Sequence, residues 1–168
     1  MDKRWIYIII ILIIGISALY VIVSSSNTVG SAIVDVNKFI ITLPDDFNIQ
    51  DNDKEYSILI NRNTNARIIV KDIGKGNFVN ERLKNDSDIY HTKDYKEIKN
   101  KTFEHDGIKV KTIYGIGEDN KINSTAYFMK FDHTFNIKTN NFKDIDTIEE
   151  NVKFIIDTLQ RDYKQSQD

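Results

Sequence analysis

Three histidines are the first residues to consider as metal ligands or as general bases. His91, His105 and His133 are scattered along the chain, and two of them fall in predicted turns at residues 104–107 and 132–134. A metal site needs several ligands that converge, whereas a histidine in a turn is ordinarily solvated. The sequence therefore predicts solvated turn histidines and no metal-ligating residue.

The acidic stretch DNDKE, residues 51–55, begins like a calcium-binding loop. Tyr56 stands where an EF-hand has its tight-turn glycine, and Arg62 stands where it has its bidentate glutamate. An EF-hand is therefore excluded, although weak binding of a cation by these residues stays open. The stretch Gly115-Ile116-Gly117 lacks a third glycine and a following helical pattern, so it does not indicate a phosphate-binding loop.

Motifs for covalent catalysis are absent from the sequence. The chain contains no cysteine, no G-x-S-x-G motif and no pair of acidic residues at a recognisable spacing. We therefore predict no catalytic, cofactor-binding or metal-binding residues and no cofactor. A non-enzymatic binding or assembly module is favoured, and the alternative is a membrane-tethered hydrolase whose site is assembled only in space.

Composition limits the partners and the compartment. The net charge of −2 gives no electrostatic support for a nucleic-acid partner. Without cysteines the chain has no disulfides, so outside a cell its fold must depend on packing alone. The predicted partners are the membrane and another protein that acts through surface contacts.

The N-terminal segment, residues 5–23, is an uncharged apolar run. As a helix it would be about 28 Å long, close to the hydrocarbon thickness of a bilayer. Lys3 and Arg4 precede it, and no basic residue follows until Lys38, which predicts a cytoplasmic N-terminus. A retained single-pass anchor is favoured over a cleaved signal peptide, because the residues after the run match a cleavage site poorly.

The anchor divides the chain into four parts. Residues 1–4 form the cytoplasmic end, 5–23 the transmembrane anchor, 24–31 a polar linker, and 32–168 one extracytoplasmic domain at the cell membrane. A domain of that length is long enough to bury a core of its own.

Strand patterns dominate the first half of this domain. A strand is predicted within residues 38–44, and the segments 56–61 and 66–73 are predicted to pair as an antiparallel hairpin. Apolar residues occupy both faces of these strands, which indicates cover above and below the sheet. A helix with a loose apolar spacing is predicted over 77–90, with Phe78, Leu83 and either Ile89 or Tyr90 facing inward.

The second half of the domain predicts a meander and a closing helix. Asp106-Gly107 is a strong hairpin signal, and a further strand over 124–131 reverses near Asp132 and His133. A C-terminal helix is expected to begin with Asp146 as its cap. Its apolar stripe predicts a face docked on the sheet; the stripe consists of Ile148, Val152, Ile155, Ile156, Leu159 and Tyr163.

The order of these elements, with the motifs TLPDDF at 42–47 and TFEHDGIKVKTIYG at 102–115, resembles the PsbP-like superfamily. That group includes the PsbP subunit of photosystem II and DcrB-type bacterial lipoproteins. The resemblance implies an α+β fold, an antiparallel sheet between helices in an α/β/α sandwich, here preceded by one transmembrane helix. It also implies a function in binding or assembly with other proteins. This chain lacks the lipid-bearing cysteine of the lipoprotein members, and no site residue carries over.

Three glycosylation sequons begin at Asn85, Asn100 and Asn123. They are compatible with a domain that faces outward, although about two are expected by chance from the asparagine, serine and threonine content. Their use would depend on the transferase of the source organism.

Overall fold

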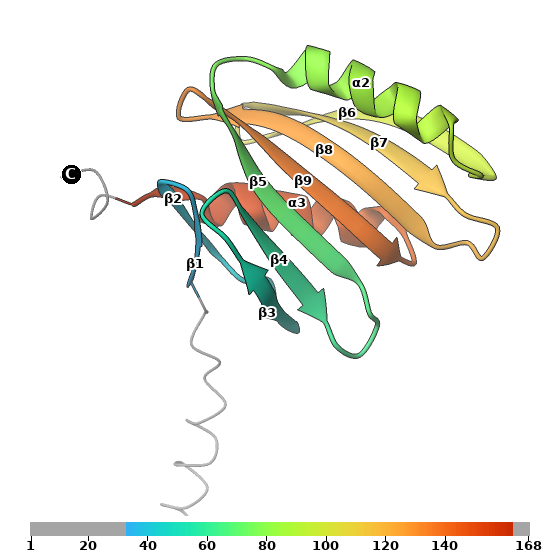
Figure 1. Ribbon diagram of the computed structural model, residues 1–168, viewed down its shortest axis with the longest axis horizontal. Coiled ribbons are helices and arrows are strands. Elements are labelled where there is room, and N and C mark those ends of the chain that lie inside the picture. The colour runs from blue at the N-terminus through green and yellow to red at the C-terminus, as the bar shows by residue number, and fades with distance from the viewer. Residues whose placement is uncertain (1–32, 163–168) are drawn as a thin grey trace, which may run out of the picture. The chain divides into compact units, whose positions relative to one another are not determined.

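The computed structural model describes residues 33–162, which form two antiparallel sheets and two helices (Figure 1). The first half contains β1 (Ile33–Val36), β2 (Phe39–Thr42), β3 (Phe47–Asn52), β4 (Tyr56–Asn61), β5 (Arg67–Lys75) and α2 (Val79–His91). The second half contains β6 (Glu97–His105), β7 (Ile108–Ile116), β8 (Ile122–Lys130), β9 (His133–Phe142), α3 (Ile145–Thr158) and β10 (Gln160–Arg161). The predicted α+β class is therefore correct for the described part of the chain.

The larger sheet has seven strands in the order β3-β4-β5-β9-β8-β7-β6. The predicted hairpin of residues 56–61 and 66–73 is confirmed as β4 and β5. The Asp106-Gly107 turn joins β6 to β7, and both of its residues have the positive φ that a tight two-residue hairpin requires. The β8–β9 turn is at Phe131-Asp132, so His133 begins β9 and is not a turn residue as predicted.

The smaller sheet has three strands in the order β1-β2-β10. The predicted strand within 38–44 is confirmed as β2. Strands β1, β3 and β10 are not predicted from the sequence, because they are short or show weak alternation. Their positions depend on pairing with distant segments; for example, Gln160 in β10 is paired with Ile40 in β2.

The two faces of the larger sheet are covered differently. One face carries α2, which packs against β7 and β8, and the other carries α3 together with the small sheet (Figure 1). The predicted sandwich of a sheet between helices is therefore correct, with a second sheet added to one layer. The core lies on the α3 side; its buried members include Phe39, Leu59, Phe128, Phe135, Ile137, Ile148 and Ile155.

The predicted helix over 77–90 is confirmed as α2, and its inward face agrees with the prediction only in part, since Tyr90 is buried whereas Phe78 and Leu83 are half-buried. Val79, Asp86 and Tyr90 are the buried residues, whereas Ile89 is exposed. Spacings of seven and four residues place Val79, Asp86 and Tyr90 on one helix face. A carboxylate occupies the middle of that face, which is why an apolar pattern alone did not identify it.

The predicted closing helix is confirmed as α3, but its cap is two residues earlier than expected. Asp144 is the cap, and its Oδ1 accepts a hydrogen bond from the Thr147 backbone N–H at 2.7 Å. This bond lowers the pKa of the Asp144 carboxyl. Ile148, Val152, Ile155, Ile156 and Leu159 are buried as predicted, while Tyr163 lies outside the described residues.

The predicted anchor at 5–23 and its flanks at 1–4 and 24–31 also lie outside the described residues. Between residues 33 and 162, neither helix is both long and apolar enough to cross a membrane.

Candidate functional site

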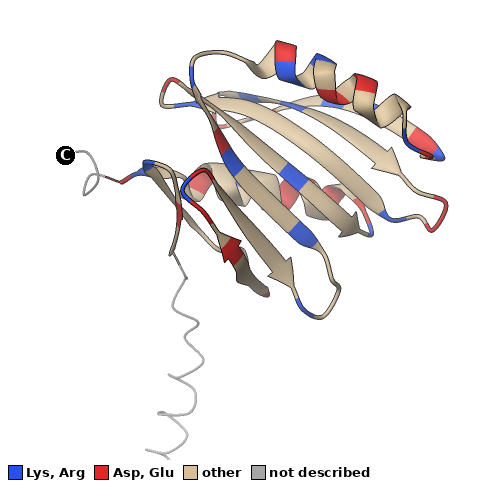
Figure 2. Ribbon diagram, viewed as in Figure 1, with Lys and Arg blue, Asp and Glu red and all other residues tan. Residues whose placement is uncertain are grey.

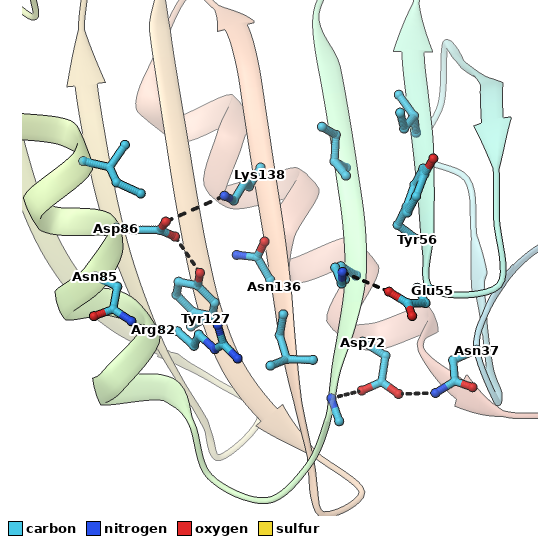
Figure 3. A pocket seen from close by; sticks show the side chains of 16 residues that line it. Asn37, Glu55, Tyr56, Asp72, Arg82, Asn85, Asp86, Tyr127, Asn136 and Lys138 are labelled. Carbon is cyan, nitrogen blue, oxygen red and sulfur yellow. Dashed lines mark hydrogen bonds and ion pairs between the residues drawn. The ribbon is translucent and has the colours of Figure 1, made fainter. Parts of the chain in front are cut away.

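A broad groove lies on the α2 side of the larger sheet, where no helix covers strands β4, β5 and β9 (Figure 3). Its volume is about 780 Å³. We call it the α2 groove. Its lining residues are Asn37, Glu55, Tyr56, Ile58, Ile69, Lys71, Asp72, Ile73, Gly74, Arg82, Asn85, Asp86, Ile89, Tyr127, Asn136 and Lys138.

Strand alternation explains which side chains reach this groove. Along β4 and β5, Leu59 and Ile68 are fully buried toward the core, whereas Ile58 and Ile69 are half-buried on the opposite face. Apolar residues on both faces of these strands predict cover on both sides of the sheet. That prediction is wrong for this half of the sheet, where isoleucines form the floor of an open groove.

Asp86 is the buried acid at the α2 wall of the groove. Its Oδ2 accepts a hydrogen bond of 2.5 Å from the Tyr127 hydroxyl, and its Oδ1 lies 3.7 Å from the Lys138 Nζ. Burial and the bond to Asp86 raise the pKa of Tyr127 well above its ordinary value, so this hydroxyl remains a donor. Figure 3 shows these three side chains converging from α2, β8 and β9.

Charges of both signs line the groove in equal number. Glu55 and Lys71 form an exposed ion pair at 3.1 Å across its far wall. Arg82 is exposed on α2 and makes no ion pair with any carboxylate among residues 33–162. Acidic and basic residues are also intermixed over the ribbon in Figure 2. The lining of the α2 groove therefore has no excess of either charge.

Asp72 is a fully buried carboxylate at the end of the groove, with a side chain 0% exposed. Its oxygens accept hydrogen bonds from Asn37 Nδ2 at 2.7 Å and from the Gly74 backbone N–H at 2.9 Å. They also lie 3.0 Å from His133 Nδ1. A β-bulge between Asp72 and Gly74 brings that N–H back toward the carboxylate. The carboxylate thus joins β5, β9 and the β1–β2 turn.

The prediction that the turn histidines are simply solvated is wrong for His105 and His133. Both are half-buried, and each is bonded to an aspartate. Only His91 is exposed. The reason is tertiary: the partners Asp157 and Asp72 are 52 and 61 residues away in the sequence.

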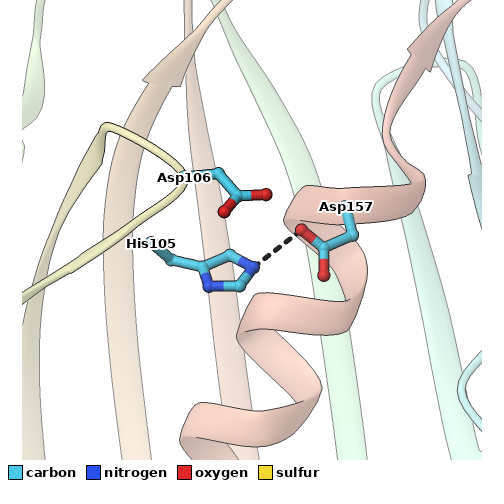
Figure 4. Close-up of side chains that lie close together, drawn as sticks. All are labelled: His105, Asp106 and Asp157. Carbon is cyan, nitrogen blue, oxygen red and sulfur yellow. Dashed lines mark hydrogen bonds and ion pairs between the residues drawn. The ribbon is translucent and has the colours of Figure 1, made fainter.

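His105, Asp106 and Asp157 form a cluster whose ligand atoms lie within 4.8 Å of one another, a spacing that could hold a divalent cation after small adjustments (Figure 4). His105 Nε2 is 2.7 Å from Asp157 Oδ1. The Lys130 ammonium donates a hydrogen bond to the neighbouring Ile156 carbonyl. Burial lowers the pKa of Lys130, while the nearby carboxylates of Asp157 and Asp106 raise it. The contacts present therefore tie the β6–β7 turn to the end of α3.

The other residues considered from sequence have ordinary roles in the structure. Asp51 lies in β3 and accepts a hydrogen bond from Tyr56 at 3.3 Å. Asn85 and Asn100 are exposed, whereas Asn123 bonds to Tyr95 and to the Asn141 backbone. An attached glycan would thus disturb the fold least at Asn85 and Asn100.

Sequence reasoning missed Asp72, Asp86 and Arg82. A signal for Asp72 was present, because it continues the alternating set Ile68 and Val70 on the buried face of β5. No local signal could identify Arg82 as a groove residue, since its neighbours in the groove come from other strands.

Comparison with known proteins gives a fold-level likeness. No protein-family model matches the chain, and no curated protein matches it either. The chain is similar to a solved PsbP-type structure. This is the solution structure of cyanobacterial PsbP (CyanoP) from Synechocystis sp. PCC 6803, with 12% sequence identity and a TM-score of 0.46. The match covers 80% of this chain and 96% of that one.

Proposed function

We propose that this protein is a non-catalytic binding module, and that the α2 groove holds a segment of another protein. The observation that carries the proposal is the uncovered half of the sheet, where half-buried isoleucines line the groove beside α2. Apolar surface rimmed by charged groups is typical of protein-binding sites.

The dimensions of the groove favour a helix as the occupant. The three uncovered strands, each about 4.8 Å from the next, span roughly 10–14 Å. A helix with its side chains is about 10–12 Å wide, so one helix would fill the space beside α2 and complete that layer. Its apolar face would pack on Ile58 and Ile69. An acidic residue on it would pair with Arg82, whose guanidinium has no carboxylate partner within residues 33–162.

A matched pair of isoleucine substitutions tests the groove. Ile89 lines it and is 49% exposed, while Ile49, on edge strand β3, is 43% exposed and does not line it. The Ile89→Lys substitution places a charge on the apolar wall, so we expect the yield of the crosslinked complex in native membranes to fall at least several-fold. The Ile49→Lys variant should keep the wild-type yield. The yields are compared by immunoblot, with equal melting temperatures showing that both variants are folded.

Three results of that experiment would contradict the groove as the binding site: equal loss in both variants, loss only in Ile49→Lys, or no loss in either. If the captured segment were residues 1–32 of the same chain, the proposal of a separate partner protein would be wrong.

The alternative of a membrane-tethered hydrolase has one favourable observation. The Asp72 carboxylate orients the His133 ring, as a carboxylate orients the histidine that acts as general base in many hydrolases. However, no serine, threonine or cysteine is among the described residues that line the hollow beside His133. We therefore retain the binding module as the proposed function.

We also propose that residues 5–23 anchor the protein in the cell membrane, with residues 1–4 inside and the folded domain outside. The uncharged run and the Lys3-Arg4 flank support this orientation. Protease added to intact cells or spheroplasts is expected to digest the domain, as seen by immunoblotting a C-terminal tag. Digestion only after lysis would show the opposite orientation, and recovery of the domain in the medium would show cleavage.

A further inference from the structure

A second hollow, which we call the His133 pocket, lies where four distant segments meet. It has a volume of about 360 Å³ and is lined by Lys38, Phe39, Lys75, Phe131, His133 and Arg161, with Asp132 at its side. These residues come from the β1–β2 turn and β2, the end of β5, the β8–β9 turn and β9, and β10. Asp72 separates it from the α2 groove, because this buried carboxylate bonds both Asn37 of the groove and His133 of the pocket.

Arg161 is held in place in this pocket. Its Nη2 donates to the Phe131 carbonyl at 3.0 Å, and its guanidinium carbon lies 5.5 Å from the Phe131 ring centroid. Phe131 has a φ of 55°, a left-handed conformation that is costly for a bulky side chain. Its ring also stacks on Phe39 with centroids 6.0 Å apart. The strained turn therefore presents an aromatic wall with a guanidinium fixed against it.

His133 is oriented from the other side. Its Nδ1 lies 3.0 Å from both oxygens of the fully buried Asp72, and its ring packs edge-on against Phe39. Because Nδ1 faces Asp72, Nε2 is the ring nitrogen that can contact a ligand. Nε2 makes no hydrogen bond within residues 33–162. The side chain is 19% exposed, so the ring is accessible from the pocket but not mobile in solvent.

The charge of the pocket is opposite in sign to that of the whole chain. Among the lining residues, Lys38, Lys75 and Arg161 carry three positive charges against the carboxylate of Asp132, in a protein of net charge −2; the Asp72 carboxylate lies behind the His133 ring. Among residues 33–162, no carboxylate lies within ion-pair distance of these three cations. Three cations without a carboxylate partner among these residues, one of them a planar guanidinium, suit a ligand with several anionic oxygens.

We propose that the His133 pocket binds a phosphate group carried by a small molecule or by a lipid headgroup. Arg161 would donate to two phosphate oxygens, and Lys38 and Lys75 would supply charge. His133 would donate from Nε2–H to a third oxygen when both of its ring nitrogens carry a proton, with Nδ1–H directed to Asp72. The pocket is larger than a phosphate ion, which occupies on the order of 50 to 100 Å³ by comparison with about 30 Å³ for one water. The remaining space beside Phe39 and Phe131 would hold the organic part of the ligand. This proposal does not depend on the α2 groove.

The test is a calorimetric titration of the full chain, in an uncharged detergent that contains no phosphate, with inorganic phosphate at constant ionic strength. We expect saturable binding that Lys75→Gln and Arg161→Gln each weaken roughly tenfold, since each removes a charge-assisted contact. Lys84→Gln, at an exposed lysine on α2 away from the pocket, removes the same charge and should leave the affinity unchanged. Melting curves check that each variant is folded. If Arg161→Gln does not fold, the affinity of Lys75→Gln alone tests the proposal.

Two further arms distinguish the source of the phosphate. Short-chain phosphatidylglycerol that competes with inorganic phosphate, when phosphatidylcholine does not, would identify an anionic lipid headgroup. Competition by glycerol phosphate alone would identify a free phosphorylated molecule. Absence of phosphate binding to the wild-type chain would overturn the proposal. An equal loss of phosphate affinity in Lys84→Gln would also overturn it, because the binding would then depend on overall charge and not on the His133 pocket.

Discussion

Replacing Leu159 by alanine is expected to lower the free energy of unfolding by about 2–5 kcal/mol. Leu159 is 1% exposed at the end of α3, where its backbone N–H bonds to the Ile155 carbonyl and its side chain joins the core. Truncation removes buried methyl groups and leaves a cavity that the rigid sheet cannot fully close. A domain of this size has a total stability of about 5–15 kcal/mol, so the melting temperature should fall by many degrees.

The control is Gln160→Ala, one residue further along. Gln160 is exposed, and its pairing with Ile40 in β2 is a backbone pairing that alanine keeps. We expect a change of less than about 0.5 kcal/mol. Chemical denaturation of both variants measures the difference. Equal and small effects would mean that α3 is not docked in solution, and its apolar face would then become a candidate binding surface.

Replacing Asp72 by alanine is expected to destabilise the fold by about 3–5 kcal/mol. The carboxylate is fully buried and holds Asn37, the Gly74 backbone N–H and His133 together. Alanine would leave the Gly74 N–H and the His133 ring nitrogen, both half-buried, without this acceptor, and each unsatisfied buried group costs about 1–3 kcal/mol, whereas the exposed Asn37 amide can bond to water instead. The loss should therefore exceed what a small cavity alone would cause.

Two comparisons isolate this effect. Asp88→Ala changes an exposed aspartate on α2 and should be close to neutral in the same denaturation experiment. Asp72→Asn keeps one acceptor oxygen but adds an amide donor, so we expect an intermediate loss. A wild-type melting curve for Asp72→Ala would show that solvent reaches these donors and that the network does not stabilise the fold.

The sequence by itself determined the elements whose signals are local. Asp106-Gly107 predicted its hairpin because a tight turn needs residues that tolerate positive φ. The i, i+4 and i+7 spacing of Ile148, Val152 and Ile155 predicted a docked helix, and all three are buried. Alternation along β4 and β5 likewise predicted a paired hairpin.

Only the tertiary structure decided which faces were covered and which polar groups met. Ile58 and Ile69 resemble core residues in sequence, yet α2 packs over β7 and β8 and leaves them on the floor of a groove. His133 resembles a solvated turn residue, yet β5 brings Asp72 against its ring. The reason is physical: periodicity reports which side of an element is apolar, whereas the partner of that side is selected by strand pairing across long stretches of chain. In this fold the pairing of β5 with β9 assembles both the groove and the His133 pocket.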